Sequence, residues 1–157
     1  MRGKIGLAVA ALAVAVTLVA VPLTSASSVD TKLRIGYSLR LFGVGIGPGG
    51  TAGTFIASGA VRDAGTATGR STVTPFGDGG DGRLEGTITL VGALGTITEE
   101  FSGMAGPLGM PHTAAHGTFE LVGGTGAYAG ISGHGTFTTV ADFSTNQAVR
   151  IDVGAAD

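Results

Sequence analysis

The chain has no cysteine and few charged residues, and each of these shortages excludes some classes of function. Without cysteine it can form no disulfide, carry no lipid-modified N-terminal cysteine and use no thiolate nucleophile. Charged residues make up 13% of the sequence and the net charge is −2, so the basic patch that nucleic acid or an anionic membrane requires is missing. No serine lies in a GxSxG elbow, so nucleophilic catalysis has no support.

The N-terminal residues have the pattern of an export signal. Arg2 and Lys4 form a positive segment, residues 5–21 are an uncharged run rich in Ala, Val and Leu, and Thr24 and Ala26 place small residues at a cleavage site. We therefore expect a secretory signal peptide over residues 1–26 and a single secreted domain over residues 27–157, without stable membrane association after cleavage. The alternative is an uncleaved anchor helix, because the apolar run is at the lower limit for spanning a bilayer.

Glycine is the abundant residue, with 30 in the chain, well over twice its usual share of about 7%. A disordered glycine-rich chain would be poor in apolar residues, whereas here they recur with period two, as in half-buried strands. Glycine within such strands is typical of bends and bulges in a curved sheet. The pattern predicts strands over residues 32–42, 54–62, 66–74, 83–91, 94–102, 113–122, 131–141 and 148–153.

Eight short antiparallel strands joined in sequence leave two exposed edges unless the sheet closes on itself. We therefore predict an all-β fold, an eight-stranded up-and-down barrel whose interior holds side chains or one small ligand. A two-sheet sandwich is the alternative. A recurring Gly-Thr-aromatic or Gly-Thr-Ile tripeptide resembles an internal repeat, but its irregular spacing fits independent strand chemistry better, with Thr outward, the apolar residue inward and Gly permitting strong coiling of the strand. It begins at Gly53, Gly86, Gly95, Gly117 and Gly135.

Residues 119–137, FELVGGTGAYAGISGHGTF, carry a resemblance to a known group of proteins. Two alternating arms flank a glycine-dense connection with one aromatic residue. The GGTGAYAG turn resembles that of the allene oxide cyclase and dirigent-like barrels, above all their secreted bacterial members, and it is similar to turns in some calycin-like bacterial domains. The resemblance implies an apolar cavity with few polar groups, a glutamate among them, and a cyclase or isomerase-like activity.

Two residues are candidates for a site in the barrel. In residues 94–102, Glu99 shares a face with Ile97 and Phe101, while Glu100 lies on the other face. Glu99 is therefore the candidate catalytic acid or base, because burial raises a carboxyl pKa into the range useful for proton transfer. Tyr37 is its candidate companion in ligand binding. Alternatively Glu99 lies at a wet barrel mouth or at a bulge that shifts the register, and Tyr37 is a core residue with a satisfied hydroxyl.

Metal and cofactor sites are not expected. Three histidines on one face of their strands could bind zinc through their imidazole nitrogens; these are His112, His116 and His134. That face is the Thr-rich one, however, so we interpret them as solvent-exposed side chains. The acidic GDGGDGR segment supplies only Asp78 and Asp81 as calcium ligands and is better explained as a hairpin turn. The GGTG turn leads into another strand, which does not suit a phosphate-binding loop, and we predict no cofactor.

Two classes of function fit a secreted barrel of this kind. The first is a small-molecule protein that binds an apolar ligand, with possible cyclase-like or dirigent-type chemistry through Glu99. The second is a structural or protein-interaction module with a filled interior, whose outer Thr-rich face makes contacts between copies in a homo-oligomer. Abundant interior Ala and Gly favour the first, because they leave space.

Overall fold

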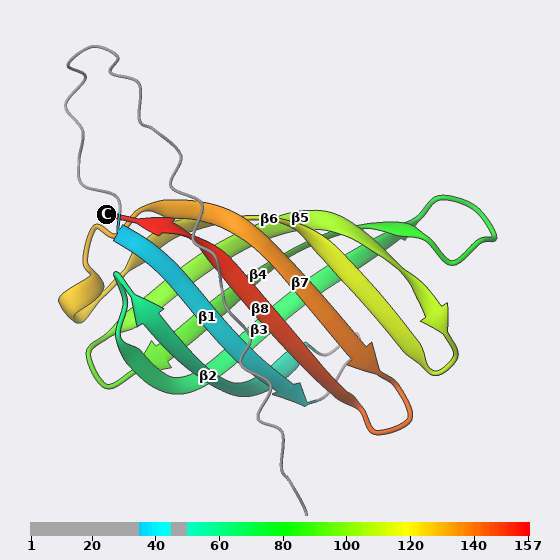
Figure 1. Cartoon of the computed structure of the whole chain (residues 1–157), viewed down its shortest axis with the longest axis horizontal. Helices are drawn as coiled ribbons and strands as arrows, with labels where there is room; N and C mark the ends of the chain where they lie inside the picture. The colour runs from blue at the N-terminus through cyan, green and yellow to red at the C-terminus, as the bar shows by residue number, and fades with distance from the viewer. Residues whose placement is uncertain (1–34, 45–49) are drawn as a thin grey trace, which may run out of the picture. The chain divides into compact units, whose positions relative to one another are not determined.

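A computed structural model describes residues 35–44 and 50–157, and these residues form a closed antiparallel barrel of eight strands in chain order (Figure 1). The predicted signal peptide lies outside the described residues. The strands are β1 (Ile35–Val44), β2 (Thr51–Gly59), β3 (Asp63–Pro75), β4 (Gly82–Gly92), β5 (Thr96–Gly109), β6 (His112–Gly124), β7 (Gly133–Asp142) and β8 (Gln147–Ala156).

Closure comes from the pairing of the first strand with the last. β1 and β8 are antiparallel over their whole length, from Ile35 opposite Ala156 to Val44 opposite Gln147. Every described strand thus has two neighbours, which removes the exposed edges of an open sheet. The predicted barrel is confirmed, and the sandwich alternative is wrong. Among the described residues, none of the helical structure is long and apolar enough to cross a membrane.

The Gly-Thr-Phe tripeptides explain how aromatic side chains fit inside so narrow a barrel. In β6 and β7 the pairing is reciprocal: Gly117 lies opposite Phe137, and Phe119 lies opposite Gly135. A Cβ atom built on Gly135 would lie 2.6 Å from the Phe119 ring and 2.3 Å from the Val153 carbonyl oxygen, whereas one built on Gly117 would lie 2.1 Å from the Ser102 carbonyl oxygen. Glycine is therefore required at both positions by the close approach of a neighbouring backbone, and at Gly135 by the Phe119 ring as well.

Each strand differs from its predicted bounds by at least one residue at both ends, and β5 and β7 show the physical reasons. β5 continues to Gly109, well past the predicted end at Ser102, because β4 and β6 pair with it on both sides despite its glycine and proline content. β7 begins at Gly133, so Ile131 lies in the preceding connection and packs against the core from there.

β8 faces opposite to what its hydrophobic pattern suggests. Its apolar residues Val149, Ile151 and Val153 are exposed on the outer wall, while Arg150 and Asp152 are buried inside. Strand pairing fixes this orientation, because Arg150 lies opposite the inward residue Leu41, and Asp152 lies opposite the inward residue Phe137. The barrel interior therefore holds two charged side chains from one short strand.

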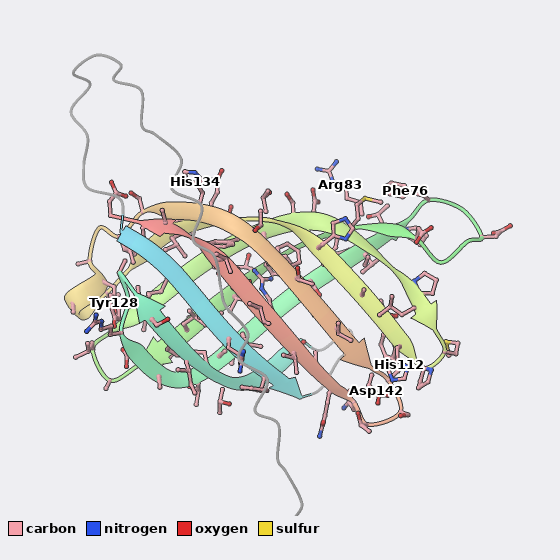
Figure 2. All side chains as sticks on the ribbon, viewed as in Figure 1. Phe76, Arg83, His112, Tyr128, His134 and Asp142 are labelled. Atoms are coloured by element: carbon pink, nitrogen blue, oxygen red, sulfur yellow. The ribbon has the colours of Figure 1, made fainter. Side chains whose placement is uncertain are left out.

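The GGTGAYAG segment closes one end of the barrel, which we call the η1 end. A single 3-10 turn, η1 (Gly126–Tyr128), lies between β6 and β7, where the sequence predicted that the turn leads directly into a strand. The Tyr128 hydroxyl donates to Asp63 over 3.1 Å, and Asp63 also accepts from the backbone N–H of Ala93 and Leu94. Three connections are thereby tied together at this end (Figure 2).

Candidate functional site

An internal cavity of about 180 Å³ lies in the half of the barrel away from η1, which we call the β7–β8 end. Its walls are mostly apolar and small, because alanine occupies inward positions on several strands in succession. The inward apolar residues of the wall are Leu41, Ala67, Leu84, Ile88, Ala105, Ala115, Ala141 and Ala148. The hydroxyl-bearing residues of the lining are Thr51, Thr68, Ser71, Thr113 and Thr139.

The other half of the interior is filled. Larger side chains from the same strands meet there, and the η1 connection covers them with Tyr128. The buried residues of this filled half are Leu39, Ala57, Val61, Leu90, Ile97, Phe119, Leu121, Tyr128 and Ala156. Within the interior of the described barrel, the cavity is therefore confined to the β7–β8 end.

Arg150 forms the floor of the cavity, where the two halves meet. Its Nε donates to Asp152 Oδ1 over 2.7 Å, and its Nη2 donates to Glu99 Oε1. The guanidinium carbon lies 4.4 Å from the ring centroid of Phe101 and 4.2 Å from that of Phe137. Two carboxylates and two aromatic faces thus hold one cation in a single orientation, which suits recognition of a ligand from a fixed direction.

Glu99, Arg150 and Asp152 form a layer across the barrel interior, which we call the charged layer. It contains one cation and two carboxyl groups, and both carboxyl groups are fully buried. Burial raises the pKa of Glu99 from its ordinary value of 4.5 to about 8, with Arg150 opposing the rise and Asp152 adding to it. Burial also raises the pKa of Asp152, again against the pull of Arg150. One proton on Glu99 makes the layer electrically neutral, the state that an apolar interior favours.

Two oxygens of this layer, Glu99 Oε2 and Asp152 Oδ2, are buried without a hydrogen-bond partner among the described residues. Such acceptors are expensive to bury when both carboxyl groups are ionised. A proton on Glu99 turns one of the two oxygens into a donor, so the geometry and the raised pKa of Glu99 lead to the same protonation state.

The structure places Glu99 inside the barrel and Glu100 outside, as the register predicted. A bulge does lie at Thr98 and Glu99, opposite Gly123 and Leu121 of β6, but the extra residue belongs to β6 and leaves Glu99 inward. The alternative that Glu99 lies at the solvent-filled mouth of the barrel is wrong, because Glu99 is 0% exposed. Glu99 is nevertheless not among the cavity-lining residues, and Arg150 lies between it and the cavity.

The remaining members of the layer were not found from the sequence. Arg150 and Asp152 lie in a predicted strand, and their two-residue spacing places them on one face, which is the signal that was available. The apolar residues that alternate with Arg150 and Asp152 hid this signal, because they form the more obvious hydrophobic face of the strand. The side chain of Tyr37, the predicted companion of Glu99, lies outside the described residues, although its backbone pairs with Gly59 and Gly154.

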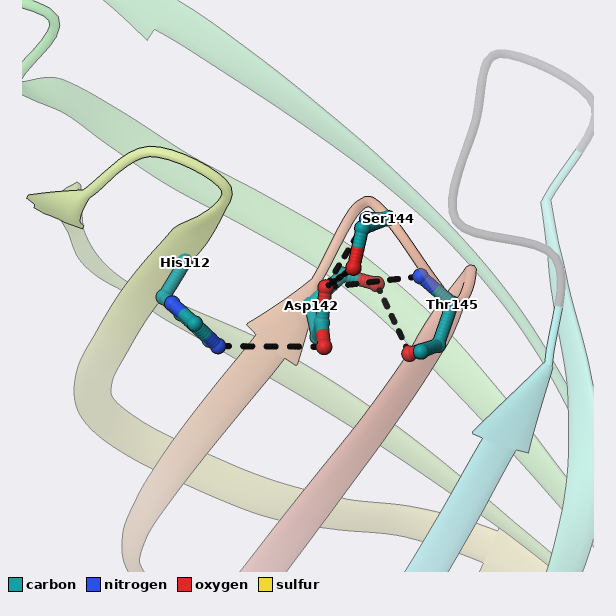
Figure 3. A network of polar contacts seen from close by, with 4 residues as sticks. All are labelled: His112, Asp142, Ser144 and Thr145. Atoms are coloured by element: carbon teal, nitrogen blue, oxygen red, sulfur yellow. Dashed lines mark hydrogen bonds and ion pairs between the residues drawn. The ribbon is translucent and has the colours of Figure 1, made fainter.

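Phe143 lies at the mouth of the cavity and is held by the turn between β7 and β8. Asp142 Oδ1 accepts from the backbone N–H of Ser144 over 2.8 Å and from its hydroxyl over 2.6 Å (Figure 3). The hydroxyl bond from Ser144 is the main reason why the pKa of Asp142 lies below its ordinary value. His112 Nε2 lies 3.7 Å from Asp142 Oδ2, which links this turn to the neighbouring one.

The three histidines lie on the outer face of the described barrel. His112, His116 and His134 are all exposed, as the sequence indicated, and no cluster of metal-binding side chains occurs in the part of the chain that the structure describes. Figure 2 shows His134 pointing away from the barrel wall and His112 at the end of the barrel opposite to Tyr128. Asp78 and Asp81 lie in the exposed connection between β3 and β4, which is a hairpin as predicted.

Comparisons of the chain with protein-family models, with curated proteins and with solved structures give no match.

Proposed function

We propose that this protein binds a small, mostly apolar molecule inside the barrel, at the β7–β8 end. The observation that carries the proposal is the cavity with alanine-rich walls and a single fixed guanidinium at its floor. Ligand sites combine largely apolar surfaces with a few placed polar groups, and this cavity has that composition.

The cavity volume limits the size of the ligand. About 180 Å³ is close to the roughly 150 Å³ of an engineered protein cavity that binds benzene. It is well below the roughly 300–1,000 Å³ of sites for drug-sized molecules. The proposed ligand therefore has about one ring or a comparable short branched chain, and longer molecules would extend past Phe143 into solvent.

Binding is better supported than the cyclase or isomerase-like chemistry that we also considered. An acid or base must reach the proton that it transfers, either directly or through one water. Glu99 holds a proton at neutral pH, but Arg150 separates it from the cavity. Glu99 thus acts here on Arg150, as a positioning residue.

The proposal includes export of the protein and a kinship with the allene oxide cyclase and dirigent-like barrels. Export rests on the residue pattern of residues 1–26. Kinship rests on the GGTGAYAG turn, and the closed eight-stranded barrel supports it without identifying a family. Fold alone transfers no reaction, so the ligand assignment depends on the cavity.

Titration of the purified protein with toluene, followed by calorimetry and by NMR shifts of the cavity methyl groups, tests the proposal. We expect saturable binding with a negative heat capacity change, because apolar surface is buried. Ala115→Leu fills the cavity and should abolish the binding. Thr118→Leu adds the same side chain to the outer face of β6 and should leave it unchanged. Toluene binding that survives Ala115→Leu, or that never saturates, would contradict the proposal.

A second candidate, an interaction module that pairs with another copy of this chain, is favoured by the outward apolar row on β8. Val149, Ile151 and Val153 are 40–57% exposed, and Phe42 of β1 lies beside Val149. A dimer through this wall should be visible in analytical ultracentrifugation and should be lost in Ile151→Lys but kept in Val122→Lys, an exposed apolar position on β6. A monomer at high concentration would remove this candidate.

A further inference from the structure

The polar floor of the cavity carries information about the chemical class of the ligand. Arg150 is the only ionisable side chain among the described residues that line the cavity. A guanidinium has five N–H donors and no acceptor, and the bonds to Asp152 and Glu99 use two of them. Any polar group of a ligand that reaches the floor must therefore accept a hydrogen bond.

The two aromatic rings restrict where that group can approach. The ring centroids of Phe101 and Phe137 lie 4.4 and 4.2 Å from the guanidinium carbon and 5.4 Å from each other, so the rings occupy adjoining sides of the group and not its two opposite faces. A ligand can therefore approach only from a side that the rings leave open, where it meets the N–H groups that Asp152 and Glu99 do not use. An acceptor in the plane of the group makes a good hydrogen bond in that position.

The charge of the layer decides between charged and neutral ligands. Arg150 is already matched by Asp152, and Glu99 shares the same guanidinium, so the layer has no unmatched positive charge to offer an anion. A ligand carboxylate would leave excess negative charge beside two buried carboxyl groups. A ligand cation would face the guanidinium itself. Both would be desolvated in an apolar cavity without compensation.

We propose that the ligand is an uncharged, ring-sized molecule with an acceptor oxygen, such as a ketone, ester or ether, that accepts a hydrogen bond from Arg150. This inference rests on the proposed binding function and adds the class of molecule that the cavity selects. Glu99 and Asp152 are positioning residues in it, since they hold the guanidinium in place and cancel its charge.

Four planar probes of nearly equal shape test the inference on the unmodified protein at pH 7. Acetophenone is neutral with an acceptor oxygen, α-methylstyrene replaces that oxygen by a methylene group, benzoate is the anion and benzamidine is the cation. We expect acetophenone to bind at least about tenfold more tightly than α-methylstyrene, because hydrogen bonds to charged groups are the stronger ones. Benzoate and benzamidine should bind at least about tenfold more weakly than acetophenone.

Any different result would contradict a specific claim: the hydrogen bond from Arg150, the neutral class of the ligand or the binding function itself. Equal affinities for acetophenone and α-methylstyrene would remove the hydrogen bond but keep the cavity and the proposed function. Tightest binding of benzoate would mean that the ligand is an acid. If none of the four binds, the proposed function itself is wrong.

Arg150 is tested in two independent ways. Arg150→Met should reduce the affinity for acetophenone to that for α-methylstyrene, which itself should change less than about twofold. Because this variant leaves two buried carboxyl groups and can fail to fold, the second test uses the wild-type protein. The Nε–H resonance of Arg150 should shift on addition of acetophenone but not of α-methylstyrene, and an unmoved resonance at saturation would contradict the contact.

Discussion

The two halves of the barrel interior are built from the same eight strands with the same alternation, yet one is filled and the other is hollow. The filled half contains Leu90, Ile97 and Leu121, whereas the inward positions of the other half include Ala105, Ala115 and Ala141. Period-two patterning assigns a residue to the inside but does not determine how much of the inside is occupied. The size of the inward residues separates a core from a cavity in this barrel.

The charged layer between the halves belongs to neither type of interior. A buried ion pair is seldom more stable than well-packed apolar residues of the same volume, so Glu99, Arg150 and Asp152 contribute little to folding by their presence. Their arrangement does give the hollow half a polar floor. This contrast supports a functional interpretation of the layer, and the predictions below separate it from the packing around it.

The largest effect is expected from removing the cation of the layer. Arg150→Met leaves two buried carboxyl groups without their partner and should lower the free energy of unfolding by about 3–5 kcal/mol at pH 7, as measured by urea denaturation. The loss should shrink as the pH falls, because protonation of the carboxyl groups removes their uncompensated negative charge. Arg83→Met removes an exposed arginine that is paired with Glu85, and should cost less than about 1 kcal/mol. Equal losses in the two variants would mean that the layer is not buried.

A comparable effect should come from the filled half. Phe119→Ala removes a ring that is 1% exposed and should destabilise the barrel by about 3–5 kcal/mol. Phe143→Ala removes the same ring from the cavity mouth, where it is 50% exposed, and should cost about 1 kcal/mol or less. A loss below about 1 kcal/mol for Phe119→Ala would show that the faces of β6 are assigned in reverse.

The pH dependence of stability should reveal the proton on Glu99. Its pKa is higher in the folded protein, about 8, than the ordinary 4.5, so the folded state binds the extra proton between these values. The contribution of this group to wild-type stability should therefore be fully present below about pH 4.5 and should decline as the pH rises toward about 8. The decline is on the order of a few kcal/mol, because one pKa unit corresponds to about 1.4 kcal/mol.

Substitution of Glu99 separates this contribution from those of other groups. Glu99→Gln mimics the protonated side chain and should remove much of the decline between pH 5 and 8, leaving any part due to Asp152. Glu100→Gln changes the exposed neighbour and should leave the decline as it is in the wild type. If Glu99→Gln and the wild type show the same pH profile, Glu99 is ionised in the folded barrel.

The sequence alone was enough to predict part of the fold and part of the candidate site. Period-two alternation along eight segments and the need to remove exposed strand edges were sufficient to predict a closed barrel, and parity placed Glu99 inside. Parity alone could not orient β8, because Val149 and Ile151 present the stronger apolar pattern on the face that turned out to be exposed. Strand pairing decided that orientation, and with it the contribution of Arg150 to the site. The extension of β5 to Gly109 likewise depends on its neighbours.

The most direct test of the account compares one enlargement in each half. Ala115→Leu places a larger side chain in the hollow half, and Ala57→Leu places the same side chain in the filled half; both alanines are 6% exposed. Urea denaturation should show Ala115→Leu to be more stable than the wild type by about 0.5–2 kcal/mol, because it fills space. Ala57→Leu should be less stable by about 1–3 kcal/mol, because it overpacks the core. If both variants are destabilised to the same extent, the β7–β8 end has no cavity and the proposed binding site does not exist.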